Sequence, residues 1–65
     1  MNKVREVEPL LYEVEEAVCA LRLSRTVIYE LIRSKRLRSV KQGRRRLIPA
    51  SALTEYVACL EAEAA

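Results

Sequence analysis

The 65-residue chain contains no histidine, no phenylalanine and no tryptophan, and it has a single glycine. Without histidine it lacks both the commonest general acid–base side chain and the commonest metal ligand. One glycine is too few for a glycine-rich loop that cradles phosphates. We therefore expect no enzyme activity, no cofactor and no metal site.

Long apolar runs are also absent. No stretch approaches the roughly 18 residues of a membrane-spanning helix, and the N-terminus lacks the apolar region of a secretory signal. We expect a cytoplasmic protein without membrane association. Cys19 and Cys59 lack C-x-x-C spacing, and we expect two buried, reduced thiols; a disulfide or a reactive thiol is the alternative.

The chain does have one strongly basic segment. Residues 22–46 hold ten lysines and arginines against one acid, Glu30, whereas acids outnumber bases in residues 1–21 and 47–65. Charge segregated in this way usually faces a polyanion, and a solvated basic face without a partner is the alternative. A chain of this length forms one small domain with a small core.

The spacing of apolar residues predicts three helices. The apolar face of the first consists of Val14, Ala17, Val18 and Leu21. The second follows Ser24 as its N-cap, and its apolar side consists of Val27, Ile28, Leu31 and Ile32. The third follows Pro49, and the residues expected on its inward face are Leu53, Tyr56, Val57 and Leu60. About three residues separate the first two helices, a break typical of a helix-turn-helix.

The segment between the second and third helices predicts a β-hairpin, because "LRSVK" and "RLIP" are extended runs on either side of "QGRR". Its register has two alternatives. A two-residue loop at residues 42–43 sets Val40 opposite Arg45, whereas a four-residue loop at residues 42–45 sets Val40 opposite Leu47. The residues expected to tie the hairpin to the core are Val40, Leu47 and Ile48.

The expected fold is mainly α with a small β-hairpin, a winged helix-turn-helix in the order helix, helix, hairpin wing, helix. Residues 10–61 form this domain. Residues 1–9 form a flexible N-terminal tail, and residues 62–65 form a short acidic tail.

The candidate DNA contacts lie on the second helix and on the hairpin, because a helix fits the major groove and a slender arginine-bearing loop reaches a phosphate or the minor groove. On the helix, the expected contacts are Arg25, Thr26, Tyr29 and Arg33. On the wing, they are Lys41, Gln42, Arg44, Arg45 and Arg46. Further phosphate contacts are expected from Ser24, Arg36 and Arg38.

The segment "LLYEVEEAVCALRLSRTVIYELIRSKRLRSVKQGRRRLIPASALTEYV" resembles the excisionase-type DNA-binding domains, which are related to the winged-helix head of the mercury-resistance-regulator (MerR) family. The resemblance implies DNA binding with residues 24–35 in the major groove and residues 41–46 as the wing. Glu13 replaces the family's usual Ser or Thr cap, and Arg22 and Lys35 replace glycines. A left-handed conformation at Arg22 or Lys35 costs on the order of 1 kcal/mol.

The expected function is that of an excisionase, which binds double-stranded DNA beside an attachment site and bends it for an integrase. No coiled coil or effector domain follows the third helix in these residues, which disfavours a ligand-sensing regulator. We expect a monomer in solution that binds DNA cooperatively with neighbours through the acids Glu13, Glu15, Glu16, Glu55 and Glu61. The alternatives are a small transcriptional regulator of phage or plasmid genes and a protein-interaction module.

Overall fold

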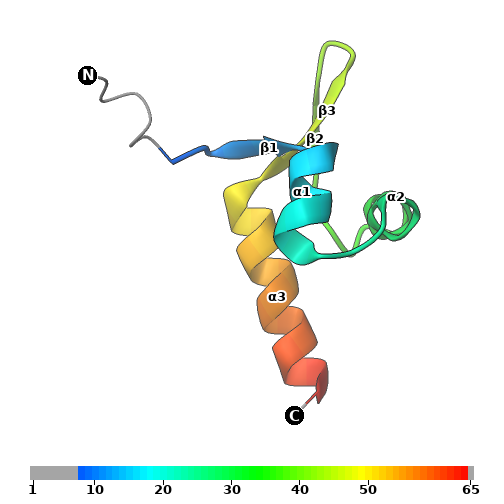
Figure 1. Ribbon diagram of the computed structural model, residues 1–65, viewed down its shortest axis with the longest axis vertical. Coiled ribbons are helices and arrows are strands. Elements are labelled where there is room, and N and C mark those ends of the chain that lie inside the picture. Colours follow the sequence, from blue (N-terminus) through cyan, green and yellow to red (C-terminus); the bar gives the residue numbers. More distant parts are fainter. Residues whose placement is uncertain (1–7, 65) are drawn as a thin grey trace.

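The computed structural model describes residues 8–64, and it confirms the winged helix-turn-helix. The helices are α1 (Val14–Leu21), α2 (Arg25–Arg33) and α3 (Ala50–Ala64), and the strands are β1 (Leu11–Glu13), β2 (Val40–Gln42) and β3 (Arg45–Pro49). In Figure 1 the β2–β3 hairpin projects at one end of the molecule and α3 at the other. Residues 1–7 of the expected tail lie outside the described residues, and residues 62–64 continue α3.

Local hydrogen bonds define where the two helices of the helix-turn-helix begin. The Ser24 hydroxyl oxygen accepts a hydrogen bond from the backbone N–H of Val27 at 3.2 Å, as expected of the N-cap of α2. At the start of α1, the Glu16 carboxylate accepts one from the backbone N–H of Glu13 at 2.8 Å. The acidic first turn of α1 therefore helps to fix the entry of the chain into the helix. Between the helices, Arg22 has φ +60°, so the left-handed conformation foreseen there is present.

The end of α2 turns the chain back into the core through a Schellman motif. The backbone N–H of Arg36 bonds the carbonyl of Leu31 at 2.9 Å, and that of Lys35 bonds the carbonyl of Ile32 at 3.1 Å. Lys35 has φ +69°, the left-handed conformation that this motif requires. The turn buries Leu37 to 1% exposure, a core residue that the sequence pattern did not identify.

The hairpin belongs to a three-stranded antiparallel sheet with the order β1-β3-β2. Val40 pairs with Leu47 as in the second predicted register, but the four-residue loop predicted with it was wrong, because Gln42 pairs with Arg45. The loop is therefore only Gly43 and Arg44. Gly43 has φ +61°, as the first loop position of a type II′ turn requires. β1 was not predicted as a strand.

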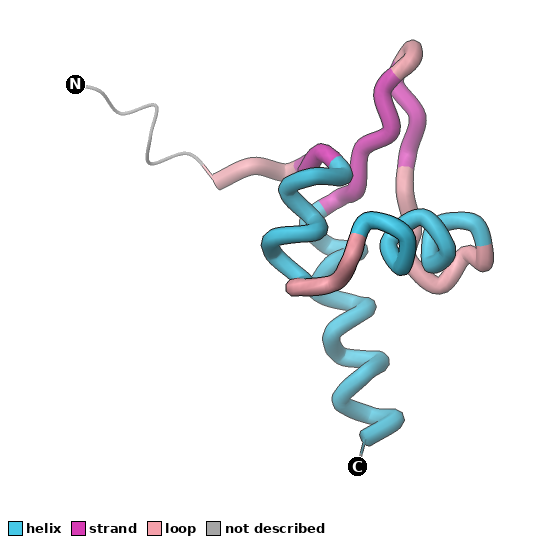
Figure 2. Tube along the Cα trace, turned by 45° about the vertical axis from the view of Figure 1, so that its right-hand side comes forward, coloured by secondary structure: helices cyan, strands magenta, loops and turns pink. Residues whose placement is uncertain are grey.

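The core lies where α1, α2, the start of α3 and the sheet meet (Figure 2). Its residues are Val14, Ala17, Ile28, Leu31, Ile32, Leu37, Ile48, Ala52, Leu53 and Tyr56. Leu47 is also buried, but it points to the opposite face of the sheet from Ile48 because adjacent strand residues alternate.

Several burial predictions were wrong. Val57 and Leu60 are 41% and 39% exposed, because this half of α3 extends beyond the rest of the domain. Val40 is exposed on an edge strand, and Val27 lies at the margin of the buried face of α2. The two thiols that were expected to be buried belong to exposed, unbridged cysteines, Cys19 and Cys59.

Candidate nucleic-acid interface

A basic hollow of about 580 Å³ lies between α2 and the hairpin. Four of its lining residues are cationic, namely Arg33, Lys35, Arg38 and Arg46. The others are Tyr29, Ile32, Leu37 and Ser39. The Schellman turn brings these cations together, because it reverses the chain after α2 and leads it directly into β2. The hollow thus concentrates positive charge in a concave surface.

The outward face of α2 adjoins this hollow. The four residues predicted to read DNA, which are Arg25, Thr26, Tyr29 and Arg33, are all exposed. Tyr29 is 42% exposed and also lines the hollow, so it belongs both to the outward face of α2 and to the hollow. Arg25 forms an ion pair with Glu15 of α1. Ser24 is exposed beside this face, and its hydroxyl is already engaged as the cap.

The wing presents two different faces. Lys41 and Arg46 are directly opposed across the strands, and Arg46 lines the hollow. Like charges placed opposite each other destabilise a sheet, so an anion between them would relieve the repulsion. Gln42 and Arg45 are paired on the other face.

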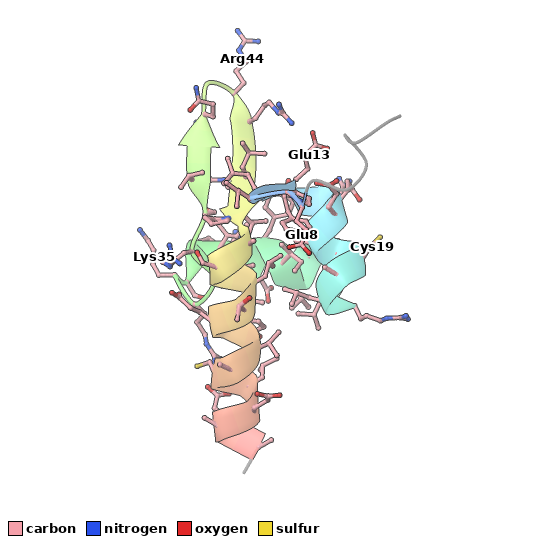
Figure 3. All side chains as sticks on the ribbon, turned by 90° about the vertical axis from the view of Figure 1, so that its left-hand side faces the viewer. Glu8, Glu13, Cys19, Lys35 and Arg44 are labelled. Carbon is pink, nitrogen blue, oxygen red and sulfur yellow. The ribbon has the colours of Figure 1, made fainter. Side chains whose placement is uncertain are left out.

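The three consecutive arginines of the wing have different surroundings. Arg44 points away from the domain at the tip of the hairpin (Figure 3). Arg45 folds back into an ion pair with Glu13, which lies 32 residues earlier in the chain. Arg46 donates a hydrogen bond to the Ser39 hydroxyl at 3.2 Å. Their side chains therefore do not all face one surface.

Arg38 is held by α3. Its guanidinium donates to both carboxylate oxygens of Glu55 at 3.0 and 3.1 Å and to the Ser51 hydroxyl at 3.1 Å. The hydrogen bond from Arg38 lowers the pKa of Glu55, and the same bond raises the pKa of Arg38.

Arg36 is held by α3 in a similar way. It pairs with Glu63 at 2.5 Å and lies over the ring of Tyr56, 5.9 Å from its centroid. A phosphate contact by Arg36 or Arg38 would therefore compete with a carboxylate for the same guanidinium.

The acids expected to contact a neighbouring monomer are mostly engaged within the chain. Glu13, Glu15 and Glu55 pair with arginines of the same chain. Glu16 accepts the backbone hydrogen bond at the start of α1. Of the five acids, only Glu61 has no such partner among residues 8–64.

Comparison with known proteins agrees with this geometry. A family model described as "Helix-turn-helix domain" matches residues 11–58. An "Excisionase" of Streptomyces ambofaciens is 35% identical over 51 residues, which cover 78% of this chain and 82% of that protein. This chain belongs to the helix-turn-helix excisionases. A "Probable excisionase" of Saccharopolyspora erythraea is 44% identical over 54 residues, which cover 83% of this chain and 55% of that longer protein. No solved structure matches the chain.

One basic residue of this excisionase-family domain was missed by the sequence analysis. Lys35 lines the hollow, but it was considered only for the backbone conformation that it adopts at the end of α2. Its place in the basic segment was a usable signal. Its side-chain position depends on the left-handed backbone, which the sequence suggests only through the family's usual glycine.

Between residues 8 and 64 there is no buried polar or charged side chain. The same residues contain no group of three or more potential metal ligands among His, Cys, Asp and Glu. No helix in this part of the chain is long and apolar enough to cross a membrane.

Proposed function

We propose that this chain binds double-stranded DNA, with α2 in the major groove and the hairpin wing against the adjacent backbone. The observation that carries the proposal is the basic hollow between these two elements, in a domain whose relatives are excisionases. A DNA strand that follows the hollow would bring phosphates to Arg33, Lys35 and Arg46. Lys41 and Arg46 lie opposite each other across the strands, and a phosphate bound beside them would reduce the repulsion between their charges.

The residues of α2 have distinct proposed roles. Arg25 and Thr26 lie in its first turn, where a recognition helix commonly meets base edges, and Tyr29 and Arg33 extend the contact along the same face. Arg25 leaves Glu15 when it contacts DNA. Because exposed ion pairs are weak, this exchange costs little.

The remaining contacts are proposed to be with phosphates. Arg44 at the wing tip forms no ion pair with residues 8–64, and Lys41, Gln42, Arg45 and Arg46 support it along the strands. Arg36, Arg38 and Ser24 contribute less, since each already has a partner within the domain.

Beyond DNA binding, we propose that the protein acts in the cytoplasm without catalysis and assists an integrase by bending DNA near an attachment site. A single module of this kind presents on the order of 600 to 1,000 Å² of protein surface, too little for strong discrimination in a genome. Cooperative binding of neighbouring monomers would supply the missing selectivity. Adjacent copies that grip phosphates would also curve the duplex.

The test is footprinting on DNA that flanks the protein's own gene, combined with binding to a random fragment over a range of salt concentrations. We expect adjacent protected sites, a steep titration and bent DNA. If about five phosphates are neutralised, a plot of the logarithm of the DNA-binding constant against the logarithm of the salt concentration has a slope near −4.5.

An excision assay with an integrase, if one is encoded beside the protein's gene, decides between recombination and transcriptional control. We expect excision only when the protein is present. If the protein binds its own locus but changes only transcription there, the excisionase role is refuted and the regulator is the better account. If it protects no fragment at moderate salt, DNA binding itself is refuted.

A further inference from the structure

A second hollow of about 350 Å³ lies between the end of α1 and the middle of α3. It is lined by Ala20, Leu21, Leu53, Thr54, Val57, Ala58 and Glu61, and we call it the apolar groove. It shares no lining residue with the basic hollow. In both Figures 1 and 2, α3 extends away from the hairpin.

The apolar surface continues along α3 beyond the groove. Leu53, Val57, Leu60 and Ala64 recur at spacings of four, three and four residues, which places them in one stripe along the helix. Leu53 is covered by the domain, but Val57 and Leu60 are about two-fifths exposed. A helix with such a stripe can pack its apolar face against the apolar face of a second amphipathic helix.

The charges beside the stripe indicate the chemistry of its occupant. Glu61 is the one charged residue that lines the apolar groove, and it forms no ion pair with any residue of the described chain. α3 carries three acids and no base, and because Glu55 and Glu63 pair with arginines of the same chain, Glu61 is the acid that a cation of a partner would meet. A partner segment with lysine or arginine beside its apolar side chains would therefore complement this surface.

A second copy of the chain fits the surface poorly. Two α3 helices packed through this stripe would each present Glu61 and no base of their own, so neither Glu61 would gain a cationic partner from the other helix. The stripe also spans only about two helical turns outside the domain, whereas the repeat that indicates a coiled coil continues for at least three or four heptads. A stable self-dimer through this surface is therefore disfavoured.

We propose that the apolar groove and the adjoining stripe of α3 bind an amphipathic helix of another protein, whose apolar face is flanked by lysine or arginine. Because the two hollows are separate, this contact is compatible with occupation of the basic hollow by DNA. The proposal does not depend on the function proposed above.

The test uses three synthetic peptides of about 15 residues as probes. The first has leucines at helical spacing flanked by lysines, the second has the same leucines flanked by glutamates, and the third has the first peptide's composition in a scrambled order. Each is titrated into isotope-labelled protein and followed by NMR. We expect the lysine peptide to shift the signals of Leu21, Leu53 and Val57, and the other two to bind at least about tenfold more weakly.

Two matched variants locate the contact. Ala58 lines the apolar groove and Ala62 does not, and both are exposed on α3. Ala58→Glu and Ala62→Glu add the same charge to the same helix. We expect Ala58→Glu to weaken lysine-peptide binding at least about tenfold, because a carboxylate then lies in the apolar contact. Ala62→Glu should stay within about twofold of the parent, and both variants should keep the parent's secondary structure.

Three results would overturn the proposal. One is a set of shifts confined to the basic hollow or the wing. Another is equal binding of the lysine peptide by the two variants. The third is self-association of the parent protein in sedimentation that Ala58→Glu abolishes, which would make a second copy the occupant.

Discussion

The left-handed backbone at Arg22 and Lys35 offers a way to separate stability from DNA binding. Both residues carry a side chain at positive φ, +60° and +69°. The left-handed conformation costs an ordinary residue roughly 1 to 2 kcal/mol. Glycine removes that cost, but its greater conformational entropy also stabilises the unfolded chain by about 0.4 to 1 kcal/mol. Replacement by glycine should therefore stabilise the fold by about 0.5 to 1 kcal/mol at each site.

The two sites differ in their relation to the basic hollow. Lys35 lines it, whereas Arg22 does not. For a domain of this size, the expected gain corresponds to a rise in Tm of roughly 2 to 8 °C. Arg22→Gly should give this rise and leave DNA affinity unchanged. Lys35→Gly should give the same rise but lose one phosphate contact, which makes the salt slope shallower by about 0.9.

Alanine variants provide the controls, because alanine removes the charge and keeps the Cβ atom that causes the strain. We expect Arg22→Ala and Lys35→Ala to show no rise in Tm, and Lys35→Ala to lose as much DNA affinity as Lys35→Gly. Thermal unfolding and DNA titration measure both effects on the same samples. If Arg22→Gly melts no higher than Arg22→Ala, backbone strain is not the cause and the reasoning is refuted.

Three further predictions concern the wing, the α2 cap and the tie to α3. Arg44→Ala should make the salt slope of DNA binding shallower by about 0.9. Arg45→Ala should change this slope less, because Arg45 pairs with Glu13. Equal changes in slope would contradict a role for this ion pair in holding Arg45 away from DNA. Ser24→Ala should cost about 1 kcal/mol in urea unfolding, and Ser24→Asp should retain most of that stability. Because its folded pKa is lowered, Glu55 contributes stability that is present above its unfolded pKa of about 4.5 and lost as pH falls through the folded value. The difference in Tm between the parent and Glu55→Gln should therefore be largest near neutral pH and shrink below about pH 4; a difference independent of pH would contradict this account.

The helices were predictable because each has a regular apolar spacing and, for α2, a recognisable cap. The same spacing misplaced Val57 and Leu60, since periodicity identifies a helix face but not how far the rest of the domain extends along it. β1 was missed because a strand of three residues is too short to show alternation. Leu37 was missed because its burial depends on the turn after α2 rather than on any repeat.

The basic surface was predictable from charge segregation alone, but its internal pairing was not. The sequence places acids at both ends of the chain and gives no indication which arginines they meet. The pairs of Arg45 with Glu13 and of Arg38 with Glu55 form only when β1 and α3 come to lie beside the basic segment. Lys35 was not predicted as a site residue for a similar reason. The turn after α2 places it in the lining of the hollow, and no sequence motif indicates that position.

The ion pairs explain how so dense a basic segment is accommodated in the free protein. Ten positive charges in 25 residues repel one another, and that repulsion opposes a compact state. Four of the arginines lie against carboxylates from β1, α1 and α3, while Arg33, Lys35 and Arg46 converge on the hollow without an acid partner among the described residues. Where a phosphate replaces a carboxylate, one favourable contact is exchanged for another, so the net gain is small. In the proposed complex, most of the electrostatic affinity therefore comes from cations that form no ion pair among residues 8–64, and those that lie in the hollow or at the tip of the wing are placed to meet DNA.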